Sequence, residues 1–160
     1  MNIQIQKLKH TDIDKFTDLI RVFEEVFEMT NFTIPAETYL MQLLAKEDFF
    51  VFVALSDNKV VGGLTAYTLQ QYYSVSPLVF IYNIAIKIEV QRQRVGKLLI
   101  SNLASYCKDN GYEEMFVLAD EVDDHAIEFY RSTGATEGRV VNFNYPLYDK
   151  RSNVKESTNH

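Results

Sequence analysis

Residues 81–100 read Ile81-Tyr-Asn-Ile-Ala-Ile-Lys-Ile-Glu-Val-Gln-Arg-Gln-Arg-Val-Gly-Lys-Leu-Leu-Ile100. The first part of this stretch is apolar and β-branched, as in a buried strand, and the last part begins an amphipathic helix. A short basic turn joins the two. Because the first N–H groups of a helix have no intrahelical partner and lie at the positive end of its dipole, the stretch predicts an anion site. A cofactor that carries a pyrophosphate is the first ligand that it suggests.

The composition is that of one globular domain with an acidic surface. The chain has 160 residues, of which 47% are hydrophobic and 24% charged, and its net charge is −6. We expect no nucleic-acid partner, because nucleic-acid binding needs a basic surface, and no membrane partner, because no apolar run approaches the roughly 20 residues that span a bilayer. The absence of a secretory signal and the single cysteine, Cys107, predict a cytoplasmic protein without disulfides. An acidic protein with one basic turn suits a cationic small substrate beside an anionic cofactor.

Hydrophobic periodicity predicts a mixed α/β sheet with the element order β-α-α-β-β-β-α-β-α-β. The expected strands are 2–9, 49–55, 60–69, 78–88, 115–119 and 139–147, and the expected helices begin near 11, 35, 93 and 123. We expect residues 1–148 to form a single domain and residues 149–160 to form a polar C-terminal tail.

Two motifs open the third and fourth predicted helices. Gln91-Arg-Gln-Arg-Val-Gly96 resembles the phosphate turn Arg/Gln-x-x-Gly-x-Gly/Ala of the GNAT acetyltransferase superfamily, with Arg94 at the first glycine position. Asp123-Asp-His-Ala-Ile-Glu-Phe-Tyr130 resembles the superfamily's Asn-x-x-Ala-x-x-Leu/Phe-Tyr helix, with Asp123 at the asparagine position.

Within the superfamily, the likeness is closest to the aminoglycoside 3-N-acetyltransferases of the GNAT type. It covers nearly the whole chain and is clearest in residues 60–67, 81–85 and 119–124. Asn83 stands where those relatives carry an aspartate. The resemblance implies a mostly antiparallel sheet with a central, splayed parallel strand pair, flanked by about four helices. It also implies an acetyl-CoA-dependent N-acetyltransferase that acetylates a primary amine of a cationic small molecule by direct transfer in a ternary complex. An aminoglycoside, at its 3-N position, is the first acceptor to consider.

The resemblance assigns the cofactor to two elements and the intervening turn. Backbone groups of the central strand would bind the pantetheine arm, the turn would bind the pyrophosphate, and the fourth helix would lie beside them. The residues implied are Ile84, Ala85, Ile86, Gln91, Arg92, Gln93, Arg94, Val95, Gly96, Lys97, Asp123, Ala126 and Tyr130. We expect a negative φ at Arg94, with the helix beginning early. A solvated helix start and an ordinary core strand are the alternatives for these segments.

Tyr130 is the predicted catalytic acid, because a phenol at hydrogen-bond distance can protonate or stabilise a departing thiolate. The alternative is a helix tyrosine packed under the sheet. The predicted substrate-binding residues are acidic or replace an acidic group: Asn83, Asp120, Glu121, Asp124, Glu25 and Glu28. A solvated face, and a helix cap formed by Asp123 or Asp124, are the alternatives for the carboxylates. No His, Cys and Asp set has metal-ligand spacing.

Two other functions stay open. One is acetylation of a polyamine or a protein amine by the same mechanism. The other is a CoA-binding module without turnover, suggested by the departures at Asn83, Arg94 and Asp123. We favour the enzyme, because Gly96, Tyr130 and the acidic cluster occur together. The relatives and the apolar final strand, residues 140–145, also predict a homodimer.

Overall fold

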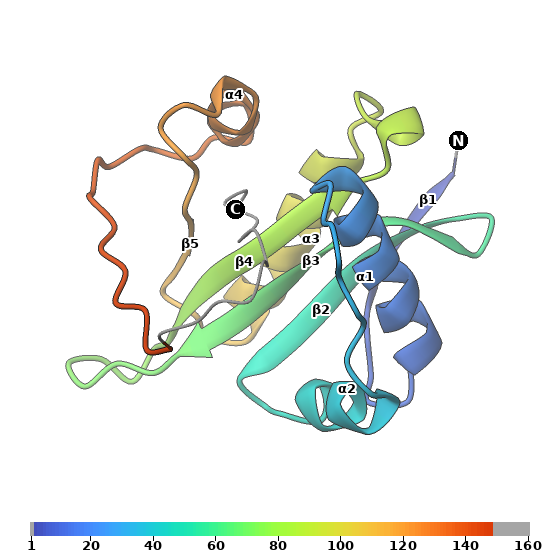
Figure 1. Cartoon of the computed structure of the whole chain (residues 1–160). Helices are drawn as coiled ribbons and strands as arrows, with labels where there is room; N and C mark the ends of the chain where they lie inside the picture. Colours follow the sequence, from blue (N-terminus) through green and yellow to red (C-terminus); the bar gives the residue numbers. More distant parts are fainter. Residues whose placement is uncertain (1, 149–160) are drawn as a thin grey trace.

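The computed structural model describes residues 2–148 and contains a five-stranded sheet in the order β1-β2-β3-β4-β5 (Figure 1). The strands are β1 (Ile3–Lys7), β2 (Phe49–Ser56), β3 (Lys59–Leu69), β4 (Leu78–Ile86) and β5 (Glu114–Val117). Neighbouring strands from β1 to β4 pair antiparallel, whereas β5 pairs parallel with β4. The predicted mixed sheet with one parallel pair is therefore confirmed.

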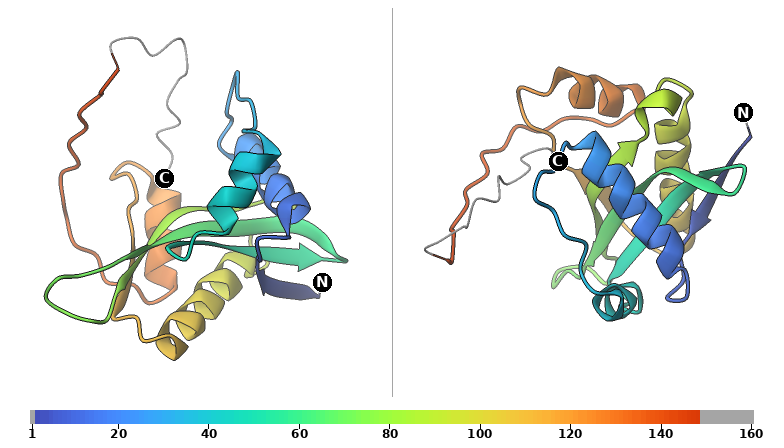
Figure 2. Two further views of the ribbon diagram at one scale, coloured as in Figure 1. Left: turned by 90° about the horizontal axis from the view of Figure 1, so that it is seen from below. Right: turned by 45° about the vertical axis from the view of Figure 1, so that its right-hand side comes forward.

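Four α-helices flank the sheet, as predicted: α1 (Ile13–Val26), α2 (Glu37–Leu44), α3 (Val95–Asp109) and α4 (Asp124–Ser132). Helices α1 and α2 cover one face and α3 covers the other (Figure 2), and α4 follows the end of β5. Strand β2 is buried on both faces because its side chains alternate between two cores. Val51 and Val53 contribute to the core under α1, and Phe52 packs in the core under α3 with Leu99. This two-sided burial explains the almost unbroken apolar run of β2.

The parallel pair separates after a short contact, which gives the predicted splay. Only Leu78–Ile81 of β4 pair with β5. On its other side, β4 carries a bulge: Thr65 of β3 faces Asn83 and Ala66 faces Ile81, so Tyr82 is the additional residue. A bulge bends and twists its strand. Residues 83–86 therefore keep their pairing with β3 but leave an open backbone edge toward β5.

The predicted strand over residues 139–147 is wrong. This segment has no strand structure and extends away from α4 (Figure 1), and its apolar side chains are exposed. An alternating sequence is suited to a strand, but a strand also needs a hydrogen-bonded neighbour. No such neighbour is present in the part of the chain that the structure describes. The predicted polar tail, 149–160, lies outside the described residues. Within residues 2–148, no helix is long and apolar enough to cross a bilayer.

Candidate active site

The N-terminal end of α3 has the donors and the charge that an anion site needs. Helix α3 begins at Val95, no side chain caps it, and its first turn contains no acidic residue. The four residues before it are exposed, and so is Lys97. Of the ion pairs formed among residues 2–148, none involves Arg92, Arg94 or Lys97. The first-turn N–H groups and three cationic side chains are thus available to a phosphate group.

Arg94 has a φ of 64° and Arg92 a φ of 67°, both in the left-handed region. The prediction of a negative φ at Arg94, with a helix that begins early, is therefore wrong. The left-handed conformation costs a residue with a Cβ about 1–2 kcal/mol, which is why glycine is expected here. The chain keeps the conformation that the glycine motif would give and adds a cationic side chain to it. Left-handed residues at 92 and 94, with Gln93 between them, turn the consecutive N–H groups of the turn toward one side, as in other anion-binding turns.

Gly96 and Gln91 join the turn to the elements around it. A Cβ added to Gly96 would lie 2.8 Å from Cε1 and 2.9 Å from Cζ of Phe129, so the missing side chain lets α4 approach α3. Nε2 of Gln91 donates a hydrogen bond to the carbonyl oxygen of Ile86 at 3.0 Å, which ties the turn to the end of β4. Both predicted cofactor residues therefore have a structural role that places the turn.

At the open edge of β4, the groups available to a ligand are backbone N–H and C=O groups, because the side chains point into the two cores. Ala85 is buried in the core under α1, whereas Ile84 and Ile86 pack against the core under α3. A ligand that enters between β4 and β5 would therefore meet main-chain groups. This arrangement fits the predicted backbone contacts with a pantetheine arm, whose amides can pair with a strand.

Helix α4 holds Tyr130 in a position where its phenol stays protonated. Asp123 is the N-cap, and its Oδ1 accepts a hydrogen bond from the N–H of Ala126 at 3.0 Å, which confirms the predicted cap. Burial, and secondly the negative charge of Asp123, raise the pKa of Tyr130 to about 12. A phenol of this pKa is a dependable hydrogen-bond donor at neutral pH. It is a weaker acid than a thiol, so its pKa suits stabilising a thiolate by a hydrogen bond better than protonating it fully.

The predicted carboxylates do not all share one environment. Asp120 and Asp124 are exposed and follow the end of β5. Glu121 instead forms an exposed ion pair with Arg139, with 3.1 Å between the two charged groups. Glu25 and Glu28 are exposed at the C-terminal end of α1 (Figure 1), at the same end of the sheet as the basic turn. The end of the sheet at which β4 and β5 finish thus has acidic groups on both sides.

An aromatic row that the sequence analysis missed crosses the sheet on the face of α1 and α2. Tyr67 of β3 contacts Tyr82 of β4 with ring centroids 5.8 Å apart. Tyr82 contacts Phe80 at 6.0 Å, and Phe80 stacks on Phe116 of β5 at 5.0 Å. Burial, and then the neighbouring Tyr82, raise the pKa of Tyr67. The alternation of Phe80 and Tyr82 was visible in the sequence, but the row forms only through the register of three strands.

Asn83 lies next to this row and faces Thr65 across the strand pair. Thr65 is 6% exposed, and its Oγ1 has no hydrogen-bond partner among the described residues. A buried hydroxyl without a partner is costly unless water or a ligand satisfies it. Asn83 therefore lies opposite a buried hydroxyl that can still accept or donate a hydrogen bond.

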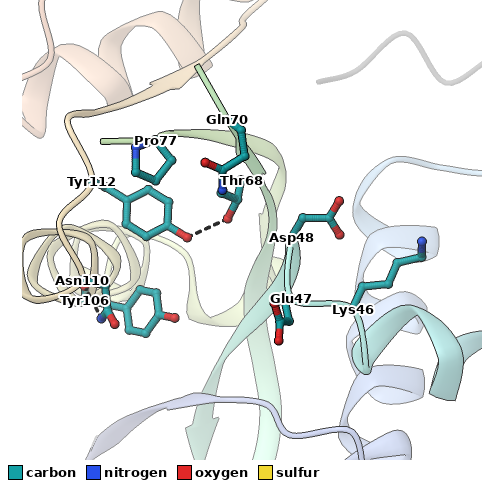
Figure 3. Close-up of a pocket in the computed structure, with 9 residues that line it drawn as sticks. All are labelled: Lys46, Glu47, Asp48, Thr68, Gln70, Pro77, Tyr106, Asn110 and Tyr112. Atoms are coloured by element: carbon teal, nitrogen blue, oxygen red, sulfur yellow. Dashed lines mark hydrogen bonds between the residues drawn. The ribbon is translucent and has the colours of Figure 1, made fainter. Parts of the chain in front are cut away.

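Two pockets lie elsewhere. The larger one, of about 600 Å³, is at the C-terminal end of α3 (Figure 3), where Thr68 and Tyr112 share a hydrogen bond of 2.6 Å between Oγ1 and the phenol oxygen. The second, of about 410 Å³, is lined by residues of α1, α2 and the segment that joins them. Neither contains a predicted site residue. The candidate active site lies instead where the parallel strands β4 and β5 diverge.

Cys107 is buried in the core under α3, as predicted for a core residue. Burial raises the pKa of its thiol to about 11, so it is not a nucleophile at neutral pH.

Comparisons with known proteins agree with this geometry. The Acetyltransferase (GNAT) family matches residues 15–135, and no curated protein matches the chain. An aminoglycoside acetyltransferase, meta-AAC0020, from an uncultured soil metagenomic sample is 50% identical, with a TM-score of 0.90 over 91% of this chain and 97% of that one. Its structures are complexes with trehalose and with sisomicin. A second soil metagenomic aminoglycoside acetyltransferase, HMB0005, is 25% identical, with a TM-score of 0.88 over 92% of this chain and 100% of that one.

AAC(6')-Iy in complex with the bisubstrate analogue CoA-S-monomethyl-acetylneamine shares the fold. Its identity is 18% and its TM-score 0.76, over 92% of this chain and 100% of that one. The family match covers most of the chain, and the splayed sheet, the basic turn and the fourth helix are all in place. The chain therefore belongs to the GNAT acetyltransferase family and is an acetyl-CoA-dependent acetyltransferase.

Proposed function

We propose that this protein acetylates a primary amine of an aminoglycoside by direct transfer from acetyl-CoA in a ternary complex. The supporting observation is the 50% identity to an aminoglycoside acetyltransferase that has been solved in complex with sisomicin, over 91% of this chain. The acidic surroundings of the open sheet end suit a polycationic acceptor. We further propose the 3-N position as the acetylated amine, on the resemblance described above, and a cytoplasmic homodimer as the working form.

The residues present fit the cofactor. In the proposed complex, the N–H groups at the start of α3, with Arg92, Arg94 and Lys97, bind the pyrophosphate. The backbone of residues 84–86 binds the pantetheine arm along the open edge of β4. Fixing the arm at both places orients the thioester toward the aromatic row and α4, which is how positioning lowers the barrier of acyl transfer.

When bound, acetyl-CoA would supply the acetyl group as a thioester, and CoA would be the leaving group as its thiolate. The acceptor nitrogen forms a bond to the acetyl carbon, the carbon–sulfur bond breaks, and the amine releases a proton to water. Tyr130 donates a hydrogen bond to the sulfur as its charge develops. Asn83 is not a base, but its side-chain oxygen can accept a hydrogen bond from the amine and orient it. Asp120 and Asp124 attract the cationic acceptor and lie near the water that takes its proton.

The structure weakens the alternative of a CoA-binding module without turnover. That alternative rests on the departures at Asn83, Arg94 and Asp123, and two of these residues, Arg94 and Asp123, adopt the conformation or the capping role expected of the family residue. Arg94 adopts the left-handed conformation of the expected glycine, and Asp123 caps α4 as an asparagine would.

A thiol-release assay with acetyl-CoA tests the proposal. Sisomicin, spermidine and a lysine-containing peptide serve as acceptors, and NMR of the isolated product identifies the acetylated nitrogen. We expect rapid release with sisomicin and little with the other two. Faster acetylation of spermidine or the peptide would contradict the aminoglycoside assignment, and an acetyl group on another nitrogen would contradict only the 3-N assignment. A rise in melting temperature with CoA but no acetylation would favour the binding module.

A further inference from the structure

Thr65, in the middle of β3, carries a buried hydroxyl that has no hydrogen-bond partner among residues 2–148. The residue is 6% exposed. On the same strand, by contrast, Oγ1 of Thr68 shares a hydrogen bond of 2.6 Å with the phenol of Tyr112. A buried hydroxyl without a partner destabilises a fold, so stability does not explain the hydroxyl of Thr65.

The hydroxyl of Thr65 and the amide of Asn83 lie on the same face of the sheet. The two residues are directly opposite one another in the register of β3 and β4. Opposite residues of an antiparallel pair have their Cβ atoms about 4.5–5.5 Å apart on one face. Ala85, two residues after Asn83, lies in the core under α1, which identifies this face as the one that α1 covers. The two polar groups are therefore neighbours.

Asn83 also lies where β4 and β5 separate. The last pair between these strands joins Ile81 to Val117, two residues before Asn83. The side chain of Asn83 is half-buried, and no hydrogen bond joins it to another residue that the structure describes. Asn83 thus has Thr65 of β3 on one side and the gap between β4 and β5 on the other.

We propose that Thr65 is a positioning residue for the acceptor amine and acts through Asn83. Its hydroxyl accepts a hydrogen bond from Nδ2 of Asn83, so that Oδ1 is turned toward the gap and accepts a hydrogen bond from the amine. This inference rests on the proposed transfer of an acetyl group to an amine, and it names the residue that fixes the orientation of Asn83.

The orientation of the amide decides whether Asn83 assists or opposes the transfer. With Oδ1 toward the amine, Asn83 binds an N–H of the amine and leaves the nitrogen lone pair free to attack the acetyl carbon. With Nδ2 toward the amine, the amide would donate a hydrogen bond to that lone pair and oppose the attack. A carboxylate needs no such control, because both of its oxygens accept hydrogen bonds. An asparagine at this position does need it, and the hydroxyl of Thr65 can supply it.

The first test compares the melting temperature with turnover in Thr65→Val and Thr65→Ser. Valine nearly keeps the shape of the side chain but removes the hydroxyl. Because that hydroxyl has no partner among the described residues, Thr65→Val should raise the melting temperature by about 2–4 °C. Its kcat with sisomicin should nevertheless fall by about tenfold, whereas the KM and the affinity for CoA should change little. Thr65→Ser keeps the hydroxyl and should retain kcat to within about threefold.

Thr68→Val is the matched control. It removes a hydroxyl that is bonded to Tyr112 (Figure 3), at a point on β3 opposite Val79, where β4 and β5 are still paired. This variant should lower the melting temperature and leave kcat unchanged, which is the reverse of Thr65→Val. If Thr65→Val lost stability and turnover together, the hydroxyl would be a structural group and the proposal would be overturned.

A double-mutant cycle tests whether Thr65 acts through Asn83. In an Asn83→Ala background, Thr65→Val should reduce kcat by less than about twofold, because the amide that the hydroxyl orients is absent. The full tenfold loss in that background would overturn the link to Asn83. An unchanged kcat in Thr65→Val alone would overturn any role of the hydroxyl in the transfer.

The acceptor used in these assays separates this inference from the proposed function. If the wild type acetylates spermidine or the peptide and not sisomicin, the aminoglycoside assignment fails, and the same loss and coupling are expected with the amine that is acetylated. Acetylation of sisomicin by the wild type, with no loss in Thr65→Val, would overturn the role of Thr65 and leave the proposed function intact. A wild type that acetylates no amine would overturn both.

Discussion

Replacing Gly96 with alanine tests whether the contact between α3 and α4 sets the position of Tyr130. The added Cβ would lie 2.8 Å from Cε1 of Phe129, whereas carbon atoms pack at about 3.5–4.0 Å. The ring must therefore move by about 1 Å. Phe129 directly precedes Tyr130 on α4, so we expect that movement to reach the phenol.

The cost in stability should be small. Overpacking costs about 1–3 kcal/mol, and the lower value applies here because the clash involves the outer end of a half-buried ring. Alanine in place of glycine in a helix recovers up to about 1 kcal/mol. The net change in the free energy of unfolding should thus stay within about 1 kcal/mol, or roughly 2–4 °C in melting temperature.

The effect on turnover should be larger, because a misplacement of about 1 Å can cost about a hundredfold in rate. We expect kcat in the thiol-release assay to fall between about tenfold and a hundredfold. The affinity for CoA should change little, since the Cβ points at Phe129 and not at the exposed turn.

The double variant Gly96→Ala/Phe129→Leu provides the internal control. Leucine lacks Cε1 and Cζ, so it removes the clash, and turnover should recover relative to Gly96→Ala when both are compared with Phe129→Leu alone. Parental turnover in Gly96→Ala would refute the reasoning. Failure of Phe129→Leu to restore turnover would show that the ring is not what transmits the effect.

Three further predictions concern charge, conformation and pH. Arg94→Gly and Arg94→Ala should weaken CoA binding equally, by about fivefold in low salt and by less in high salt, which titration calorimetry measures. Because φ is positive at this position, the glycine variant should be more stable than the alanine variant by about 1 kcal/mol, which melting curves measure. Asp120→Asn should raise the KM for sisomicin at low ionic strength more than Asp109→Asn, at the far end of α3, and equal KM values would contradict a role in acceptor binding. Because the pKa of Tyr130 is raised from 10.0 to about 12, its contribution to stability is complete below about pH 10 and is lost as the pH rises toward 12. Tyr130→Phe should therefore reduce the fall in melting temperature between about pH 9 and 11, and should lower kcat at neutral pH with CoA affinity unchanged.

Most of the fold could be predicted because hydrophobic patterns report burial. The apolar run of β2 and the amphipathic pattern of α3 each place buried residues on a regular face. The error over residues 139–147 has a physical cause. Alternation shows that a segment can form a strand, but pairing depends on another strand, which no local pattern contains.

The site was predictable where it is built from consecutive residues and not where it is assembled across strands. The basic turn and the cap at Asp123 are local motifs. The sign of φ at Arg94 could not be read from a residue type that rarely adopts the left-handed region. The aromatic row from Tyr67 to Phe116 depends on the register of three strands and on the bulge at Tyr82.

If the pantetheine arm binds between them as proposed, the separation of β4 from β5 makes the protection of the open β4 edge depend on the cofactor concentration. Amide protons of residues 82–86 that point toward the gap have no strand to protect them, so we expect them to exchange with solvent faster than those of β2. The pantetheine amides would act as a replacement strand, and its occupancy would add a binding free energy that the empty protein lacks. A protein built in this way is least rigid where it must admit its cofactor.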